Sequence, residues 1–339
     1  MRALVWRAPG QLAVERVPDP IIANAGDVIV RVRLSLVCGS DLHLLDGDFP
    51  SMQPGDVLGQ EFVGDVVEVG PAVRRHSVGD RVVVCSVISC GRCWYCRHGL
   101  LAACDNSNPE PELAELAWGA APAGRFGYAP ALGGFAGGHA EYVRVPYADQ
   151  GAFRVPDEVP DERAVFAADT APAGWMAAEL SDVRPGEVVA IWGCGAVGQV
   201  AAWAATRLGA AQVICVDRLA DRLALVAREY GVQTLHRERT DVAAELRDRT
   251  GGRGPDVCVE AVGPVAAPAS VGGGRRRSRY GPGDPLAVAE AVHACRKGGR
   301  VFLLGEHTGF VDAFPLGAAL HKGLDRKSTR LNSSHLGIS

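Results

Sequence analysis

The stretch EVVAIWGCGAVG, residues 187–198, decides the fold of this chain. Its first half is a run of apolar and β-branched residues, which is typical of a buried strand. Its second half, from Gly193 to Gly198, has the spacing G-x-G-x-x-G, and a helical pattern follows over residues 196–208. A strand, this glycine pattern and a helix in that order predict the phosphate-binding turn of a dinucleotide-binding βαβ unit.

Each position of this turn has a physical reason. Gly193 would permit the tight turn, Gly195 would let the backbone approach a pyrophosphate, and Gly198 would let the helix pack closely on the strand. The helix N-terminus, at Ala196 and Val197, would present free N–H groups and a positive dipole end to the phosphates. The alternative is an ordinary glycine-rich turn between a strand and a helix.

The next predicted strand ends in an acidic residue, Asp217. A carboxylate there would accept hydrogen bonds from a ribose 2′-OH and repel a 2′-phosphate, which favours NAD over NADP. Arg218 follows at once and belongs to the same predicted site, although its positive charge works against that preference. The alternative role for Asp217 is to cap the following helix.

Strand-like and helical runs alternate after Pro156, which predicts parallel βαβ units. The predicted strands include 187–192, 212–217, 256–261 and 300–304, and the predicted helices are 196–208, 220–230 and 285–297. Gly231 is placed to cap the second of these helices. Residues 1–155 are instead β-rich, with short strand-like runs at 28–34, 63–69 and 82–84. We therefore expect a β-rich domain at 1–155 and a doubly wound α/β domain at 156–324, with 271–283 as a basic, solvated insertion.

Composition excludes several classes of protein. The chain has 339 residues, 47% of them hydrophobic and 22% charged, with a net charge of −4. No strongly basic region dominates the chain, so nucleic acid is not expected to be its main partner. No apolar run approaches the ~20 residues that span a bilayer, and a second charge at Arg7 comes too early for a signal peptide. The expectation is a soluble cytoplasmic protein.

Four cysteines lie close together, at Cys90, Cys93, Cys96 and Cys104. In a cytosolic chain such crowding indicates metal rather than disulfides. Four thiolates can close a tetrahedral shell around zinc, and a closed shell leaves no position for a substrate. The lobe at 90–104 is therefore predicted to hold a structural zinc, with free buried cysteines or an iron–sulfur cluster as the alternatives.

A third set of polar residues follows a predicted strand. It begins with CGSDLH at 38–43, continues with GQE at 59–61, and ends with Asp169 at the junction of the two predicted domains. In this order, and with the two motifs above, residues 1–324 resemble the zinc-dependent medium-chain alcohol dehydrogenase family. Segments 126–128, 137–143 and 145–149 resemble its glutathione-independent formaldehyde dehydrogenase branch. The resemblance implies a GroES-like catalytic domain followed by a Rossmann domain.

The resemblance also implies roles for individual residues. Cys38 and Asp169 would ligate a catalytic zinc, Glu61 would be a direct or exchanging ligand, and Ser40 and His43 would relay a proton to solvent. Such a zinc acts as a Lewis acid that lowers the pKa of a bound oxygen toward ~7, while the nicotinamide accepts hydride. Considered one at a time, Cys38 could be a buried structural cysteine, and Asp169 could be a helix cap. His43 could be a surface or core histidine whose hydrogen bonds are satisfied.

The implied activity is hydride transfer between a small alcohol or aldehyde, including formaldehyde, and NAD. Two residues depart from the family pattern: Gln60 stands where its members usually have His, and Ala173 where they commonly have Thr. An amide is a poorer zinc ligand than imidazole, so the site is expected to hold zinc less tightly. The alternatives are a polyol or secondary-alcohol dehydrogenase, a zinc-free reductase, or a catalytically silent nucleotide-binding protein. The full-length parent is expected to be a homo-oligomer.

The last fifteen residues, 325–339, match no element that the resemblance predicts. They read as the translation of a sequencing-library adapter, so we expect a non-native tail and a nucleotide domain truncated after Leu324. On this hypothesis five core strands are present, a sixth is absent, and the fifth is left as an exposed edge. The alternative is a disordered C-terminal tail.

Overall fold

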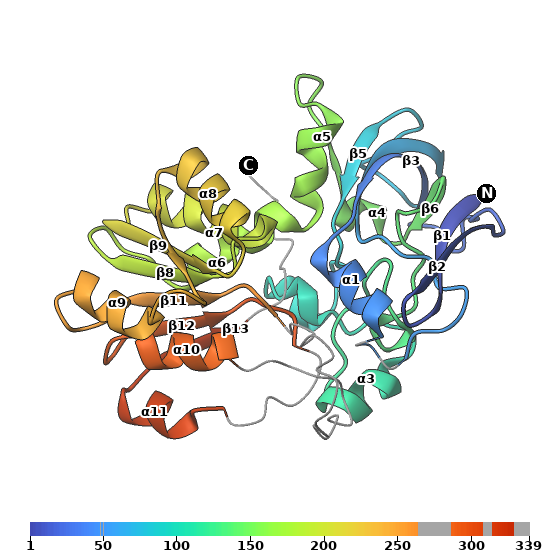
Figure 1. Ribbon diagram of the computed structural model, residues 1–339. Coiled ribbons are helices and arrows are strands. Elements are labelled where there is room, and N and C mark those ends of the chain that lie inside the picture. The colour runs from blue at the N-terminus through green and yellow to red at the C-terminus, as the bar shows by residue number, and fades with distance from the viewer. Residues whose placement is uncertain (48, 50, 264–285, 308–313, 329–339) are drawn as a thin grey trace. The chain divides into compact units, whose positions relative to one another are not determined.

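The structure is a computed structural model that describes residues 1–47, 49, 51–263, 286–307 and 314–328 (Figure 1). It divides into two compact units, and the division lies between Pro172 and Ala173. Residues 156–172 pack with the first unit because Ala164, Val165 and Ala168 share a core with its strands. The predicted insertion at 271–283 and the tail from residue 329 onward lie outside the described residues.

The first unit is built on a five-stranded antiparallel sheet, in the order β6-β3-β4-β5-β7. Its strands are β3 (Val28–Leu36), β4 (Glu61–Val69), β5 (Arg81–Val84), β6 (Tyr142–Val145) and β7 (Ala152–Arg154), and β1 (Arg2–Ala8) and β2 (Gln11–Arg16) form a separate hairpin. Alternate residues point to opposite faces of a sheet. Phe62 and Val82 therefore enter one core, while Val63 and Val83 enter the core that residues 164–168 complete.

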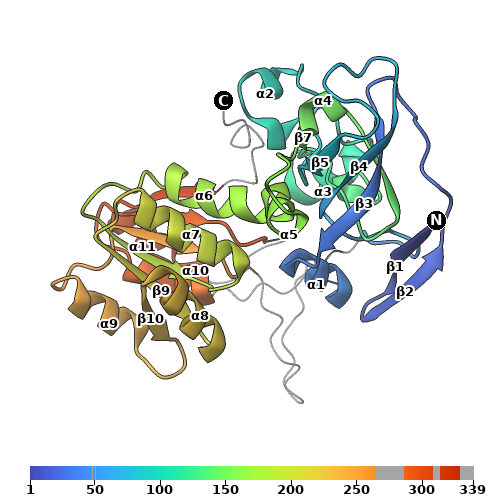
Figure 2. The ribbon, with the colours of Figure 1, turned by 90° about the horizontal axis from the view of Figure 1, so that it is seen from above.

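Short helices lie between these strands: α1 (Gly39–Asp46), α2 (Trp94–Arg97), α3 (Pro111–Trp118), α4 (Ala148–Gly151) and α5 (Asp161–Ala164). Figure 2 labels α2 and α4 in this unit, and a Cβ on Gly91, shortly before α2, would lie 2.7 Å from Gln150 Oε1 of α4. Two hydrogen bonds join the neighbouring segments, from the Tyr147 hydroxyl to Asn106 O at 3.1 Å and from Cys85 N to Gly151 O at 2.9 Å. The cysteine-rich segment is thus attached to the rest of the unit through α4.

The second unit is a six-stranded parallel sheet in the order β10-β9-β8-β11-β12-β13. The strands are β8 (Val188–Trp192), β9 (Gln212–Asp217), β10 (Gln233–His236), β11 (Val257–Glu260), β12 (Arg300–Leu303) and β13 (Asp325–Ser328). The helices are α6 (Thr170–Leu180), α7 (Ala196–Arg207), α8 (Ala220–Tyr230), α9 (Val242–Arg249), α10 (Leu286–Ala294) and α11 (Leu316–His321). This is the doubly wound Rossmann arrangement, and the predicted fold class is confirmed.

Helices cover both faces of this sheet, with α6, α7 and α8 on one side and α9, α10 and α11 on the other (Figure 1). Along β8, Val189 and Ile191 face the first group of helices, whereas Ala190 and Trp192 face the second. Because both faces are buried, the central strands β8, β9 and β11 are mostly apolar, which is why the sequence pattern predicted them. The outer strands β10 (QTLH) and β13 (DRKS) are polar, and the sequence pattern did not predict them. Gly231 ends α8 with φ +67°, as predicted for its cap.

The prediction of a missing sixth strand was wrong. β13 pairs in parallel with β12, from Arg300 opposite Asp325 to Leu303 opposite Ser328. The pairing uses backbone N–H and C=O groups, which every residue of the segment supplies whatever its side chain. Leu324, directly before the strand, is 9% exposed and joins the core, so it holds the segment beside β12. β12 is therefore not an edge strand.

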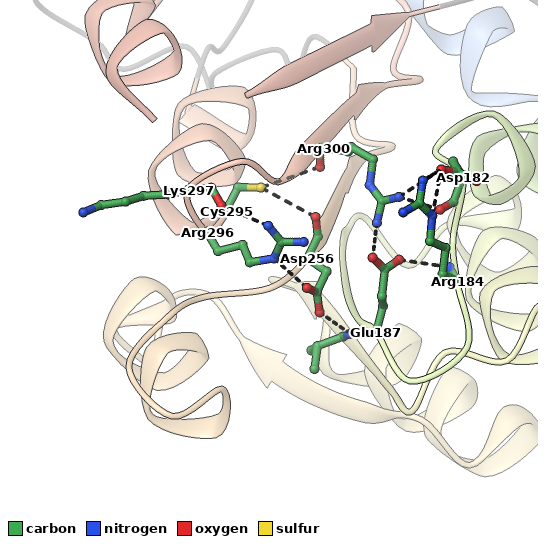
Figure 3. A network of polar contacts seen from close by, with 9 residues as sticks. Asp182, Arg184, Glu187, Asp256, Cys295, Arg296, Lys297 and Arg300 are labelled. Carbon is green, nitrogen blue, oxygen red and sulfur yellow. Dashed lines mark hydrogen bonds and ion pairs between the residues drawn. The ribbon is translucent and has the colours of Figure 1, made fainter. Parts of the chain in front are cut away.

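Polar side chains gather where β8, β11 and β12 begin (Figure 3). Asp256 accepts hydrogen bonds from Arg296 Nε at 2.6 Å and from Val188 N at 2.8 Å. Arg300 donates to Asp182 O at 2.6 Å and forms an ion pair with Glu187. These contacts connect the starts of three strands that are far apart in the sequence, so they stabilise the sheet rather than a single element.

This network predicts a pH-dependent stability. Burial raises the pKa of Asp256, but hydrogen bonds from Val188 N–H and Arg296, with the charges of Arg296 and Arg300, outweigh it and lower the pKa below its ordinary value. The ionised carboxylate therefore stabilises the folded state above the unfolded pKa of about 4, and this contribution is lost as the pH falls through the folded pKa. We expect Asp256→Asn to lower the free energy of unfolding by about 1 kcal/mol at neutral pH.

Urea unfolding at about pH 7 and about pH 3 checks this expectation, because the difference between wild type and Asp256→Asn should shrink at the lower pH. Asp248→Asn, at an exposed position of α9, is the matched control and should change little at either pH. An equal loss of stability at both pH values would show that the charge of Asp256 is not what stabilises the network.

Candidate active site and metal centres

The glycine-rich turn joins β8 to α7 and has the geometry of a dinucleotide cradle. Gly193 has φ +96°, a left-handed conformation that favours glycine. A Cβ on Gly198 would lie 1.8 Å from Gly193 O, so the third glycine is needed for the helix to approach the turn. A Cβ on Gly195 would meet only Arg222 Nη1, at 3.9 Å. The second glycine therefore faces open space, as close approach of a pyrophosphate requires.

The helix that follows supplies donors for phosphate. Ala196 and Val197 lie in the first turn of α7, whose N-cap is Gly195. The first N–H groups of a helix have no partner within the helix, and the dipole makes that end positive. The predicted residues of the turn are thus brought together, and they fit the pyrophosphate of a dinucleotide.

Asp217 ends β9 beside the same turn. Its Oδ2 accepts a hydrogen bond from Cys194 N at 2.7 Å, and its Oδ1 accepts one from Leu219 N at 2.9 Å. Each carboxylate oxygen has a second acceptor site, so a ribose hydroxyl can still be bound. Arg218 is exposed. Arg222 was missed at the sequence level because only the course of α8 brings it close to Gly195.

The four cysteines of the lobe converge on one point. Their sulfur atoms all lie within 4.8 Å of one another, with 4.0 Å between Cys90 and Cys96 and 4.0 Å between Cys93 and Cys104. A tetrahedron of zinc–sulfur bonds of about 2.3 Å has edges of about 3.8 Å, so the sulfur positions fit zinc.

Backbone N–H groups donate hydrogen bonds to sulfur in the cysteine lobe, which stabilises a negatively charged sulfur atom. The sulfur of Cys90 accepts hydrogen bonds from the N–H groups of Arg92 and Cys93, each at 3.4 Å. Burial raises the pKa of the Cys90 thiol, but these hydrogen bonds outweigh it and lower the pKa to about 6. Burial and the neighbouring Cys93 raise the pKa of Cys96. Thiolates this close together repel one another, and a zinc ion among them supplies the positive charge that offsets this repulsion.

The reactive residues of the first unit begin at α1. Cys38 is its N-cap: the sulfur accepts from the backbone N–H of Asp41, while Cys38 N donates to Asp41 Oδ2 at 2.8 Å. This is a capping box in which cysteine takes the usual place of serine or threonine. Ser40 is buried in the first turn, and His43 is half-buried three residues later on the same helical face.

Two adjacent residues at the start of β4 bond to two adjacent residues at the start of α6. Gln60 Nε2 donates to Asp169 Oδ2 at 2.7 Å, and also to Ser40 Oγ at 2.8 Å. The backbone N–H and the hydroxyl of Thr170 donate to the two carboxylate oxygens of Glu61, at 3.1 and 3.0 Å. Gln60, Glu61 and Asp169 are all buried, so these bonds fix the positions of the side chains.

Negative groups are concentrated in this cluster. Burial, and then the charges of Glu61 and Asp169, raise the pKa of the Cys38 thiol to about 12, against a hydrogen bond from Ser40. Burial, and then Asp169, raise the pKa of Glu61 to about 7, against hydrogen bonds from Thr170. A thiol and two carboxyl groups buried in one cluster form a donor set that a divalent cation suits.

The cluster is nevertheless looser than the cysteine lobe. Cys38, Glu61 and Asp169 do not have all their donor atoms within 4.8 Å of one another; in the described part of the chain only the four cysteines do. The structure brings Cys38, Ser40, Glu61 and Asp169 together as the sequence predicted, and it adds Gln60 as the residue that bonds two of them.

Two residues of this region were missed at the sequence level. Thr170 could have been found, since it directly follows Asp169. His139 could not, because it comes from a distant segment: its Nδ1 lies 2.9 Å from Ser35 Oγ, and its Nε2 lies 3.5 Å from Asp41 Oδ2. It therefore supports the helix that begins at Cys38.

Comparison with known proteins decides the family. Two family models match, described as alcohol dehydrogenase GroES-like domain over residues 24–157 and zinc-binding dehydrogenase over residues 196–277. A zinc-type alcohol dehydrogenase-like protein of Schizosaccharomyces pombe is 33% identical over 330 residues, which is 97% of this chain and 78% of the relative. The chain belongs to the zinc-type alcohol dehydrogenase family.

Three further proteins are similar to this chain. Glutathione-independent formaldehyde dehydrogenase of Pseudomonas aeruginosa is 34% identical over 77% of this chain and 65% of its own length. The structure of alcohol dehydrogenase from Thermus sp. ATN1 matches with a TM-score of 0.81 and 32% identity, over 99% of this chain and 86% of that one. A putative zinc-binding dehydrogenase of Sinorhizobium meliloti, bound to NADP, matches with a TM-score of 0.75 and 28% identity, over 98% and 84% of the two chains.

This zinc-type alcohol dehydrogenase is thus an oxidoreductase whose cofactors are zinc and a nicotinamide dinucleotide. The predicted family, the GroES-like and Rossmann fold, and the two cofactor classes are confirmed. Among the described residues, none of the helices is both long enough and apolar enough to cross a bilayer.

Proposed function

We propose that this chain transfers hydride between a small alcohol or aldehyde and NAD, and that formaldehyde is the first substrate to test. The observation that carries the proposal is the buried cluster in which Cys38 and Asp169 lie with Gln60 and Ser40. Similarity to glutathione-independent formaldehyde dehydrogenase supports the choice of substrate.

In this proposal Cys38 and Asp169 ligate a catalytic zinc, and Glu61 exchanges with them. Zinc held by these residues would supply a Lewis acid for the alcohol oxygen, and NAD bound at the glycine-rich turn would be the hydride acceptor. Hydrogen bonds from the Thr170 hydroxyl and N–H hold the Glu61 carboxylate in position while it is not bound to the zinc. Ser40 can both donate and accept a proton, and His43, half-buried on the same face of α1, carries the proton on toward solvent. The four cysteines of the lobe hold a second, structural zinc.

The proposed site residues of the dinucleotide are those of the glycine-rich turn, together with Asp217 and Arg218. We also propose a small alcohol or aldehyde, rather than nucleic acid, as the partner, and a homo-oligomeric full-length protein. The cytoplasmic location stays a prediction from the sequence.

Formation of NADH with a panel of small substrates tests this function. The panel contains formaldehyde, ethanol, propan-2-ol and a sugar alcohol, and each substrate is also given to Cys38→Ala. The expected result is NADH from a primary alcohol or from formaldehyde, with a loss in the variant of at least about a thousandfold. Activity with the sugar alcohol alone would favour a polyol dehydrogenase. No activity with any substrate would favour a catalytically silent nucleotide-binding protein, the reading that Gln60 and Ala173 support.

Asp217 predicts a preference between the two nicotinamide cofactors. Its carboxylate would repel the 2′-phosphate of NADP, so we expect kcat/KM to be on the order of 100-fold higher with NAD. Asp217→Asn removes the charge and keeps an oxygen for one of the two backbone contacts. It should reduce this ratio at least tenfold, about 1.4 kcal/mol. Arg218→Ala is the matched control and should raise the ratio. A wild type that uses NADP as well as NAD would refute this role for Asp217.

A further inference from the structure

The side-chain amide of Gln60 has a nitrogen that makes two hydrogen bonds and an oxygen that makes none. Gln60 is 2% exposed, and its amide nitrogen donates to Ser40 Oγ at 2.8 Å and to Asp169 Oδ2 at 2.7 Å. Its amide oxygen, Oε1, is buried and has no hydrogen-bond partner among the described residues. Both donors of the amide are therefore used, while its acceptor is not.

The acceptors around Gln60 explain this orientation. A reversed amide would place the oxygen beside the Asp169 carboxylate, so two acceptors would face each other and the hydrogen bond to Asp169 would be lost, although the Ser40 hydroxyl could still donate to that oxygen. A buried carbonyl oxygen without a partner is destabilising, but two hydrogen bonds, one of them to a carboxyl group, outweigh it. The cluster without metal thus selects the orientation with nitrogen toward Asp169.

A divalent cation reverses this preference. The amide nitrogen has no free lone pair and cannot ligate a metal, whereas the amide oxygen is a metal ligand of the same class as a backbone carbonyl. A cation held by Cys38 and Asp169 would repel the N–H groups that now point at Asp169, and it would attract the unpaired oxygen. The same side chain therefore has two opposite orientations, and the metal decides between them.

We propose that Gln60 is a metal-dependent latch: its amide closes the empty site through Ser40 and Asp169, and turns over to present Oε1 as a ligand when zinc binds. This inference rests on the proposed zinc-binding role of Cys38 and Asp169. Zinc must break two hydrogen bonds to enter and then receives an amide oxygen in place of an imidazole nitrogen. The zinc of this cluster is consequently held far less tightly than the zinc of the four cysteines. It can leave the protein while the zinc of the four cysteines stays bound.

Substitutions of Gln60 separate the parts of the latch. Histidine removes the amide donors and supplies a better ligand, so Gln60→His should raise zinc affinity at this site on the order of 100-fold. Glutamate is nearly isosteric, keeps an oxygen and removes the N–H groups, so Gln60→Glu should also raise the affinity. Leucine has neither donor nor acceptor, so Gln60→Leu loses the two hydrogen bonds that oppose zinc and also the Oε1 ligand. It should therefore bind zinc more weakly than Gln60→Glu, which loses the same hydrogen bonds but keeps an oxygen.

Zinc per chain, measured against a series of chelator concentrations, tests the proposal on the full chain without substrate or cofactor. Wild type is expected to release one zinc at a low concentration and to keep the other, while Gln60→His keeps both to about 100-fold higher concentration. Equal retention by wild type and Gln60→His overturns the proposal. So does a Gln60→Leu variant that binds the second zinc as well as Gln60→Glu does, or a wild type that never takes up a second zinc.

A spectroscopic measurement reports the orientation of the Gln60 amide in wild type itself, and the variants serve only to assign its signal. In protein labelled with ¹⁵N-glutamine, the side-chain signal absent from Gln60→Leu or Gln60→His belongs to Gln60. Addition of zinc should shift this signal and speed the hydrogen exchange of its NH2 group, because the two hydrogen bonds are lost. An unchanged signal while the second zinc binds overturns the latch. Since neither readout involves hydride transfer, failure of the proposed dehydrogenase activity is detected separately, in the NADH assay.

Discussion

Gly198→Ala is expected to abolish dinucleotide binding, with a loss of affinity for NADH of at least about 100-fold. The added Cβ would lie 1.8 Å from Gly193 O and 2.9 Å from Gly193 C. Both contacts are with backbone, so no side-chain rotation relieves them. The N-terminus of α7 must move away from the turn, and the N–H groups that would bind the pyrophosphate move with it.

Titration of NADH by fluorescence measures the affinity, and thermal unfolding shows whether the variant is folded. Gly195→Ala should stay folded, since its Cβ meets only the end of Arg222 at 3.9 Å, but it should also lose affinity because the Cβ enters the space left for the pyrophosphate. Gly317→Ala, in α11, has no neighbour within 4 Å and is the matched control. Binding of NADH by Gly198→Ala within threefold of wild type would contradict the proposed cofactor site.

Cys104→Ala is expected to remove the structural zinc and to destabilise the first unit by several kcal/mol. Cys104 is 1% exposed, and its sulfur lies 4.0 Å from that of Cys93. With three thiolates left the shell is open, and the remaining sulfur atoms repel one another without the cation. Because the lobe is attached to the unit through α4, its loss should lower the unfolding temperature of the protein.

Cys85→Ala is the matched control, since Cys85 is equally buried in the same unit and lies outside the four-cysteine cluster. Zinc per chain and the unfolding temperature are measured for both variants. The account expects one zinc fewer in Cys104→Ala and an unchanged zinc content in Cys85→Ala. The same zinc content in Cys104→Ala and in wild type would mean that the lobe does not hold zinc through four thiolates.

Features set by neighbouring residues could be predicted from the sequence. The strand at 212–217 and the helix at 220–230 have the predicted bounds. The glycine-rich turn was predictable because one glycine must turn, one must leave space and one must allow close packing within six residues. The cysteine lobe was predictable for the same reason, as its four ligands fall within one short segment.

Contacts between distant segments could not be predicted. The bonds from Gln60 to Asp169 and from Glu61 to Thr170 depend on the path of the chain between β4 and α6. The sequence showed Gln60 as a departure from the family pattern, but not that its nitrogen bonds to Asp169 and Ser40.

The sixth strand was missed for a different reason. The composition of residues 325–328 suggested a foreign tail, whereas strand pairing depends on the backbone and on the buried Leu324 that precedes it. Side-chain pattern is thus a poor guide to a short strand added at the edge of an existing sheet.

The central claim is that hydride passes from the carbon of a small alcohol or of hydrated formaldehyde to NAD. The most direct measurement is the mass of the reduced cofactor after turnover of ethanol or formaldehyde that carries deuterium on its carbon. The account predicts NADH that contains one deuterium from the substrate, and none when Cys38→Ala replaces the wild type. Substrate consumed with no deuterium in the cofactor, or no reduced cofactor with any member of the panel, would contradict it.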